Sequence, residues 1–503
     1  MYTASELKYS ALHFLAGKAV SAFLTFATLL LLVRILTTKE YGMYVLLVAG
    51  MEMALAIFSF GLPWLLARYL PEFRLNARRT QITRFIWQIV ALLGLFLILG
   101  SLFTCFAVPY FLPLELVQYA EVTKLFLVVL ILEGLSRRIR ENILAPLMQQ
   151  KIAQISLVVR NISFLLIIGF FAFQNNIDLL HVVYAEIVSS ILSLWLVAYG
   201  LVWHLKRYRE KIDPNDWNIP EWRKMWSLAC NMYFNNLITL LYSPQIFIFL
   251  SQRYLGIEAT ALFGFLCKIY AQIANYLPAT LLFNLIQPKL VASYISSGDI
   301  RELTHNANLA GKLSLFILMP AIVFIWLSGD EFLNLLSDGK FLLSGNYFLG
   351  LMLAMIPLSQ HRILTTVLVA IDKYRIVVWG GFFGALSLPM AYLFLEMDKG
   401  LWGPIIAIIA GQAFYNLTII FYLVHNTAYR PDTAGFFRLI LSSFCVLIIV
   451  QFTFEWLHSE ISMLLMMVAV IVCFLLSAYL IKPFKAEERK RLNTFMNKKI
   501  FIW

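Results

Sequence analysis

Among the cationic side chains within long apolar stretches of this sequence, where a charge is costly and needs a partner, four are candidates for binding a ligand. They are Lys18, Arg160, Lys268 and Arg362. An ionised side chain near the centre of a membrane-spanning helix costs at least ~2.5–3.5 kcal/mol, so such residues usually serve substrate binding, ion pathways or ion pairs. Ammonium and guanidinium groups donate hydrogen bonds to anionic oxygens. These cations therefore predict a site for an anionic ligand.

Amide and hydroxyl side chains accompany the cations at intervals of three and four residues, which place them on one face of a helix. Such faces predict a hydrogen-bonding cavity. The alternative is that Ser, Thr and Asn bond one helix to the next, and that Lys18, close to the start of its stretch, reaches the membrane interface. The polar faces comprise Lys18, Ser21, Thr25 and Thr28, then Asn231, Asn235, Thr239 and Tyr242, then Lys268, Gln272 and Asn275. The predicted binding residues are Lys18, Lys268, Arg160, Arg362, Asn231, Asn235, Gln272 and Asn275.

Three further charged residues predict a gate or a coupling site. Arg34 and Arg253 each follow an apolar stretch, where they either contact the cargo or cap a turn and meet lipid headgroups. Glu52 lies in the middle of a stretch, where it either takes up a proton that drives transport or forms an ion pair between helices. Glu133 and Glu186 offer the same two alternatives.

The elements that position these residues are fourteen apolar stretches of roughly the 20 residues that span a hydrocarbon core. Basic residues alternate between the connecting loops. With the amino terminus in the cytoplasm, 29 of the 40 Lys and Arg fall on the cytoplasmic side, counting five at the cytoplasmic ends of stretches, while 5 fall on the opposite side and 6 lie elsewhere within the stretches. This division follows the positive-inside rule and predicts both termini in the cytoplasm. The predicted spans are residues 12–33, 43–62, 85–108, 121–140, 152–173, 180–203, 225–250, 258–284, 307–327, 347–371, 375–395, 401–424, 436–454 and 461–481.

A weak internal repeat predicts two lobes of six helices in the same orientation. At a constant offset of 219 residues, Arg34 matches Arg253 and Leu36 matches Leu255. Parallel repeats of this kind are a known plan of transporters. The predicted segments are an amino-terminal lobe at 1–204, a cytoplasmic linker with a surface helix at 205–224, a second lobe at 225–428, two additional helices at 429–482 and a basic tail at 483–503.

The turn between the first two predicted spans carries a recognisable motif, Arg34-Ile-Leu-Thr-Thr-Lys-Glu40-Tyr41-Gly42-Met-Tyr44, in which Glu40 is expected to stabilise the turn. The second span leads into Gly61-Leu62 and then Arg68-Tyr69-Leu-Pro71-Glu72. With fourteen predicted spans, this chain resembles the polysaccharide (Wzx-type, O-antigen) exporters of the multidrug/oligosaccharidyl-lipid/polysaccharide superfamily.

That resemblance implies a flippase of the bacterial cytoplasmic (inner) membrane that moves an undecaprenyl-diphosphate-linked oligosaccharide between leaflets by alternating access, for surface polysaccharide biosynthesis. It implies a cavity bordered by the first, second, seventh and eighth spans, in which Lys18 and Lys268 meet the diphosphate. Expected partners are the lipid-linked oligosaccharide, anionic membrane lipids facing the basic loops, and polysaccharide polymerase machinery. No cofactor is expected.

Other classes of function fit the sequence less well. The net charge of the whole chain is +12, and the excess basic residues lie in the predicted cytoplasmic loops, where they meet anionic headgroups. Nucleic-acid binding is not indicated, because the sequence contains no soluble basic domain. No phosphate-binding loop or dense metal-ligand motif is present in the sequence. A cation-coupled multidrug exporter of the same fold remains an alternative, although basic residues outnumber acidic ones within the stretches. A membrane glycosyltransferase or polymerase is a further alternative, limited by the small size of the largest external loop, at about residues 328–346.

Overall fold

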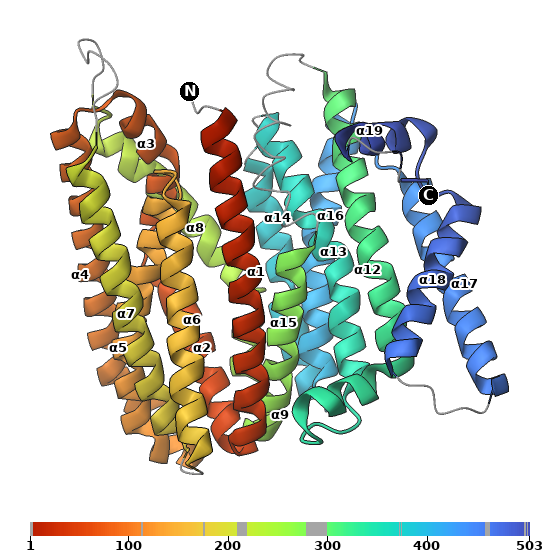
Figure 1. Ribbon diagram of the computed structural model, residues 1–503, viewed down its shortest axis with the longest axis horizontal. Helices are drawn as coiled ribbons and strands as arrows, with labels where there is room; N and C mark the ends of the chain where they lie inside the picture. The colour runs from red at the N-terminus through yellow and green to blue at the C-terminus, as the bar shows by residue number, and fades with distance from the viewer. Residues whose placement is uncertain are drawn as a thin grey trace. The chain divides into compact units, whose positions relative to one another are not determined.

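All regular structure that the computed structural model describes is helical (Figure 1). The structure describes residues 4–111, 114–174, 177–208, 219–277, 299–371, 373, 375–457, 463–496, 499 and 501–502. Twelve of the described helices are long and apolar enough to cross a membrane. Helices satisfy their own backbone hydrogen bonds, as a chain in hydrocarbon must. The predicted all-α membrane class is confirmed, whereas the count of fourteen spans stays a prediction.

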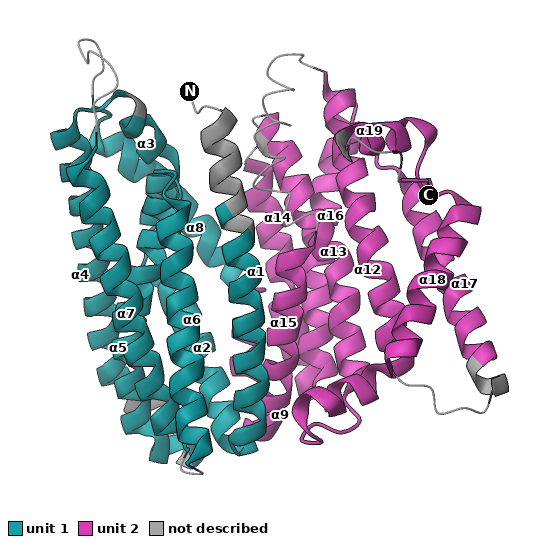
Figure 2. Ribbon diagram, viewed as in Figure 1, with its two compact units in different colours: residues 1–240 teal, residues 241–503 magenta. Residues whose placement is uncertain are grey.

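The chain forms two compact units, residues 1–240 and 241–503 (Figure 2). Unit 1 contains α1 (Ala4–Ile35), α2 (Thr38–Ile57), α3 (Leu62–Asn76), α4 (Arg79–Phe111), η1 (Leu114–Tyr119), α5 (Ala120–Arg138), η2 (Ile139–Leu144), α6 (Gln150–Phe173), α7 (Leu179–Lys206) and α8 (Trp222–Leu240). Unit 2 contains α9 (Pro244–Tyr276), α12 (Ile300–Ser337), α13 (Gly345–Ala370), α14 (Arg375–Ala385), α15 (Ser387–Glu396), α16 (Trp402–Asn426), α17 (Thr433–Leu457), α18 (Met463–Ile481) and α19 (Ala486–Met496).

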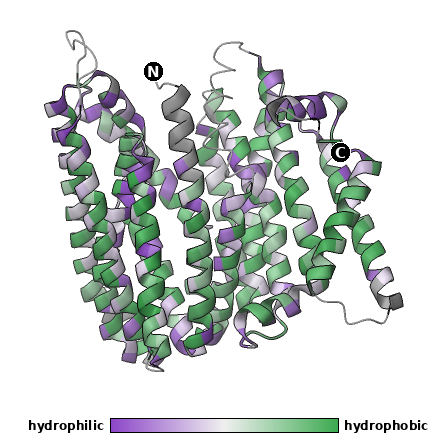
Figure 3. Cartoon of the chain, viewed as in Figure 1, coloured by the Kyte–Doolittle hydropathy of each residue, from purple (hydrophilic) through white to green (hydrophobic). Residues whose placement is uncertain are grey.

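The surface of the spans is apolar, as a lipid-facing surface must be. Hydrophobic residues cover most of the helices, and hydrophilic residues are prominent on α19 (Figure 3). Large apolar side chains point outward along several spans: Phe103 on α4 is 71% exposed, Leu166 on α6 66% and Trp195 on α7 64%. Extensive exposed apolar surface of this kind indicates contact with a membrane.

The second predicted span differs from the observed helices. The sequence predicts one helix over 43–62 followed by a basic loop, whereas α2 ends at Ile57 and the chain becomes helical again as α3. Gly61 adopts φ 73°, a left-handed conformation that favours glycine, and Pro63 lies in the first turn of α3. A Cβ at Gly61 would lie 2.1 Å from the carbonyl oxygen of Ala229 on α8, so the break also lets α8 approach closely.

Glu40 stabilises the turn between α1 and α2, as expected, and it does so together with Thr37. Thr37 Oγ1 accepts a hydrogen bond from the Glu40 N–H at 3.3 Å, and Glu40 Oε2 accepts one from the Thr37 N–H at 3.1 Å. This capping box satisfies two N–H groups at the start of α2. In unit 2, Gly256 interrupts α9 with φ 82° and ψ −179°. Gly256 follows Thr37 by 219 residues, so both members of the sequence repeat contain a break at the same position.

The predicted seventh span, 225–250, is interrupted between α8 and α9. Ser243 is extended, with φ −85° and ψ 151°, and Pro244 opens α9. Proline has no N–H and disfavours a helical conformation in the residue before it, which explains the end of α8. The surface helix expected within the linker 205–224 falls partly outside the described residues, and α8 begins at Trp222, before the linker ends.

The carboxyl-terminal tail folds back onto unit 2. Lys312 on α12 is fully buried and donates hydrogen bonds to Asp432 at 2.7 Å and to Glu488 on α19 at 2.5 Å. Phe501 and Phe484 pack with Phe316 of α12, at ring-centroid distances of 5.7 and 5.6 Å. The segment that the sequence predicts as a basic tail is therefore a structural part of this unit.

Candidate functional site

Unit 1 contains a buried network of charges that joins three helices. Arg160 on α6 contacts Glu133 on α5 at 3.0 Å and Glu186 on α7 at 2.6 Å. Arg140, in η2, contacts the same Glu133 at 2.7 Å. Tyr44 on α2 donates a hydrogen bond to Glu186 at 2.9 Å. Two guanidiniums and two carboxylates balance in this network, so each buried charge has a partner.

Serine hydroxyls complete the network. Arg140 Nη1 donates to Ser136 at 2.7 Å and to Ser193 at 2.6 Å, and Ser156 bonds the Ser193 hydroxyl at 2.9 Å. These three serines are fully buried. Hydroxyl and carboxylate partners satisfy the donors of the guanidinium, which is what allows it to stay charged away from water. The network therefore fixes α5, α6 and α7 relative to one another.

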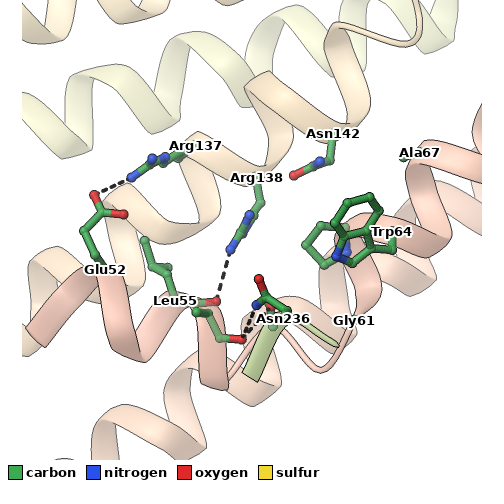
Figure 4. Close-up of a pocket in the computed structure, with 12 residues that line it drawn as sticks. Glu52, Leu55, Gly61, Trp64, Ala67, Arg137, Arg138, Asn142 and Asn236 are labelled. Carbon is green, nitrogen blue, oxygen red and sulfur yellow. Dashed lines mark hydrogen bonds and ion pairs between the residues drawn. The ribbon is translucent and has the colours of Figure 1, made fainter. Parts of the chain in front are cut away.

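A pocket of about 330 Å³ lies at the break between α2 and α3 (Figure 4). Its charged lining residues are Glu52 of α2 and Arg137 and Arg138 at the end of α5. Arg137 Nη1 contacts Glu52 Oε1 at 2.6 Å, and its Nε contacts Glu141 at 3.2 Å. Arg138 Nη2 donates to the carbonyl oxygen of Leu55 at 3.1 Å. The pocket thus contains two cations and one anion, with Glu141 outside its lining.

Two polar atoms of the pocket lining are buried without a hydrogen-bond partner among the described residues. They are Nε of Arg138 and Oδ1 of Asn142. Asn142 lies in η2, a π-helical segment in which the Ala145 N–H bonds the Arg140 carbonyl, five residues back. Single π-helical turns frequently occur at functional sites, because the extra residue redirects the side chains around it. Buried polar groups normally have partners, so these two atoms of the lining retain unused hydrogen-bonding capacity.

The rest of the lining supplies an aromatic ring and a second amide. Trp64, in the first turn of α3, is 48% exposed. Asn236 of α8 also lines the pocket, and its Nδ2 donates to the Ala56 carbonyl at 3.5 Å. A guanidinium, two amides and an indole ring together can bind a ligand that has an anionic group, hydroxyls and an apolar face.

Two alternatives are predicted for the glutamates within the spans, namely proton coupling or an ion pair between helices. Glu52 forms an ion pair with Arg137, and Glu133 and Glu186 form ion pairs with Arg160, which is the helix–helix alternative. Arg160 itself is held by both carboxylates. That Arg160 binds the cargo remains a prediction, because Arg160 would first have to release Glu133 and Glu186.

The other predicted residues lie on helices of both units. Ser21 and Thr25 on α1 accept hydrogen bonds from Asn161 of α6 at 2.7 and 3.2 Å, so part of that polar face joins two helices. The half-buried predicted residues are Lys18 on α1, Asn235 on α8, and Lys268 and Gln272 on α9. The exposed ones are Asn231 on α8, Arg253 and Asn275 on α9, Arg34 at the end of α1 and Arg362 on α13.

Apart from Glu52, sequence reasoning missed the polar residues that line the pocket. Arg137, Arg138 and Arg140 entered the count of cytoplasmic bases, and Asn142 and Trp64 were not considered. A signal was present: Glu133, Arg137 and Glu141 alternate in sign at intervals of four residues, which is typical of ion pairs along one helical face.

Comparisons with known proteins agree with the helical fold. The family profile described as "Polysaccharide biosynthesis protein" matches residues 9–293. The comparison with curated protein sequences found no match. The chain is similar to the solved structure "Lipid II flippase MurJ, inward closed conformation", with a TM-score of 0.68, 14% identity and coverage of 93% of this chain and 98% of that one.

Two transporters of the MOP superfamily are also similar in structure. An inward-facing multidrug resistance MATE family transporter matches with a TM-score of 0.61, 12% identity and coverage of 82% of this chain and 98% of that one. A transporter from Pyrococcus furiosus, described by the reverse polarity of its binding pocket, matches with a TM-score of 0.53, 14% identity and coverage of 84% and 95%. At these identities the structural matches show a shared fold alone.

Proposed function

Because this chain belongs to the polysaccharide biosynthesis protein family, we propose that it is a flippase that moves an anionic lipid-linked saccharide across the cytoplasmic membrane. The cargo is an undecaprenyl-diphosphate-linked oligosaccharide, and its polar head passes from one leaflet to the other while the lipid tail stays in the bilayer. An isolated ionised group transferred into hydrocarbon costs tens of kcal/mol in the Born limit, so the head requires a polar path with fixed positive partners.

The observation that carries the proposal is the excess of arginine in the interior of unit 1. The buried network and the pocket together contain four arginines, at 137, 138, 140 and 160, and three glutamates, at 52, 133 and 186, while the exposed Glu141, which also contacts Arg137, lies outside the lining. This balance favours an anionic cargo over a cationic one. Lys18 and Lys268 add positive charge on α1 and α9, and we assign them to the diphosphate.

Alternate exposure of the cargo site to the two sides of the membrane would complete transport. In this scheme Arg34 and Arg253 act at the outer ends of their helices. The residues that contact the cargo are Lys18, Lys268, Arg362, Asn231, Asn235, Gln272 and Asn275. Arg160 takes part if it leaves its carboxylates, and Glu52 is the candidate for coupling.

Reconstitution tests this function directly. The purified protein is placed in liposomes that contain a fluorescent lipid-linked oligosaccharide, and a membrane-impermeant quencher reports the fraction in the outer leaflet. We expect the protein to accelerate exchange between leaflets. A rate equal to that of protein-free liposomes would reject the flippase function.

A cation-coupled multidrug exporter is the second candidate, because the fold is shared with a MATE family transporter. It predicts that expression of the chain lowers the sensitivity of cells to cationic drugs and leaves surface polysaccharide unchanged. The flippase predicts the reverse: restored surface polysaccharide in cells that lack their own flippase, and unchanged drug sensitivity.

A further inference from the structure

One arginine of the α2–α3 pocket has no carboxylate at contact distance among the described residues. Both nearby glutamates, Glu52 and Glu141, contact Arg137 instead. Arg138 is half-buried, donates one hydrogen bond to the Leu55 carbonyl and retains a buried, unbonded Nε. A guanidinium presents five N–H donors in a planar fork that matches the oxygens of a phosphate group, so this arginine has capacity for an anion.

The neighbouring groups determine what else the ligand must offer. Asn142 has a buried carbonyl oxygen that lacks a donor among the described residues. Both Arg138 and Asn142 line the pocket, the first from the end of α5 and the second from η2, one turn later (Figure 4). The ligand therefore combines an anionic acceptor with a hydroxyl or amide donor. Sugar phosphates have this combination of groups.

The size and aromatic lining of the pocket define the piece of ligand that fits. About 330 Å³ is at the small end of ligand pockets, enough for one sugar ring with its phosphate and too little for an oligosaccharide. Trp64 supplies an indole face, and a flat apolar ring surface packs well against the C–H face of a pyranose.

We propose that the pocket is a binding subsite for the phosphate group and adjoining sugar ring of a lipid-linked saccharide, an assignment that rests on the proposed flippase function. Arg138 binds the phosphate oxygen, Asn142 accepts a hydrogen bond from a sugar hydroxyl or N-acetyl group, and Trp64 packs against the ring. The ion pair of Glu52 with Arg137 prevents Glu52 from neutralising Arg138, which keeps the subsite cationic.

The test measures the dissociation constants of four probes by native mass spectrometry of the full-length protein. The probes are undecaprenyl-diphosphate-N-acetylglucosamine, undecaprenyl phosphate, soluble N-acetylglucosamine 1-phosphate and phosphatidylglycerol. We expect the first probe to bind the wild type most tightly. Arg138→Gln should weaken its binding at least about tenfold, the loss expected for a charge-assisted hydrogen bond. Trp64→Leu should weaken binding of the sugar-bearing probes and leave undecaprenyl phosphate unchanged.

Asn142→Asp provides a variant that does not depend on removing the arginine. The new carboxylate lies one turn from Arg138 and gives its guanidinium an internal partner, so the protein should fold and still lose affinity for the first probe. Arg84→Gln and Trp87→Leu are matched controls, because both residues are exposed on α4 and outside the pocket lining. Their affinities should equal that of the wild type.

The outcomes separate the subsite from the function. Unchanged affinity of the first probe in both Arg138→Gln and Asn142→Asp overturns the subsite, even if the wild type flips lipid-linked oligosaccharide in liposomes. If phosphatidylglycerol binds as tightly as the first probe and depends equally on Arg138, the pocket is a phospholipid headgroup site and the saccharide assignment is overturned. If the wild type binds as expected and does not flip, the proposed function fails and the subsite stands.

Discussion

At the scale of single residues, charges that join helices differ from charges that line a pocket. Arg160 belongs to the first kind, since it lies between Glu133 and Glu186. Breaking a buried ion pair by removing one partner destabilises proteins by about 3–5 kcal/mol, because the remaining charge is left uncompensated.

We therefore expect Arg160→Met to lower the thermal unfolding temperature of the detergent-solubilised protein substantially, and Arg160→Lys to lower it less. Arg84→Met, at an exposed position of α4, is the control and should be neutral. An unchanged unfolding temperature in Arg160→Met would show that the network does not stabilise unit 1.

Lys268 is the residue with which to test the cationic path. It is half-buried on α9, and a diphosphate needs a positive partner inside the membrane. Lys268→Ala should reduce flipping about tenfold or more while the protein still inserts, and Lys268→Arg should retain part of the rate, because charge matters more than shape at a point contact. Rates are measured in the liposome assay. Wild-type transport by a well-expressed Lys18→Ala/Lys268→Ala double variant would refute the cationic mechanism.

At the scale of elements, the break between α2 and α3 is the feature that creates the pocket. Gly61 allows the left-handed turn and the close approach of α8, whose Ala229 carbonyl leaves no space for a Cβ. Gly61→Ala should displace α8 from α3, lower the unfolding temperature and reduce flipping. Gly169→Ala on α6 is a matched control, because a Cβ there meets no atom within 4 Å. Equal behaviour of the two variants would contradict the role of this break.

The attachment of α19 to α12 is a second feature at this scale. Burial raises the pKa of Asp432, but its hydrogen bond and charge interaction with Lys312, the charge of Lys485 and a hydrogen bond from the Gly435 N–H together lower it more, so the net pKa is below the ordinary value. A carboxylate with a lowered folded-state pKa stabilises the fold above its ordinary value of 3.8 and loses this stabilisation as pH falls through the lowered value. The contact between Asp432 and Lys312 should therefore persist at pH 5.

Glu488→Gln should loosen this attachment, since it removes one carboxylate from the fully buried Lys312. We expect a lower unfolding temperature and faster proteolysis of the tail, both measured at pH 7. Glu487→Gln changes an exposed neighbour and should have no effect. Equal protease resistance of the two variants would argue against the attachment.

At the scale of the whole molecule, the direction of the chain through the membrane is open to a labelling test. The division of basic residues predicts that the loops after α12 and α15 face outward and the loops after α3 and α16 face inward. In a cysteine-free background, Leu342→Cys and Met397→Cys should react with an impermeant maleimide in intact cells. Asn76→Cys and Thr433→Cys should react only after permeabilisation. Two sites that react from the wrong side would reject the predicted orientation.

The sequence by itself determined the membrane class, the all-helical structure and the role of Glu40 in the turn after α1. Each depends on local signals, namely runs of apolar residues and side chains three residues apart. The tertiary structure decided which charges meet. Arg137 and Glu52 are 85 residues apart in the chain, and Lys312 and Glu488 are 176 apart, so no local pattern specifies those pairs. The pocket depends further on a glycine turn that brings α8 against α3, which only the packing of helices distant in sequence can fix.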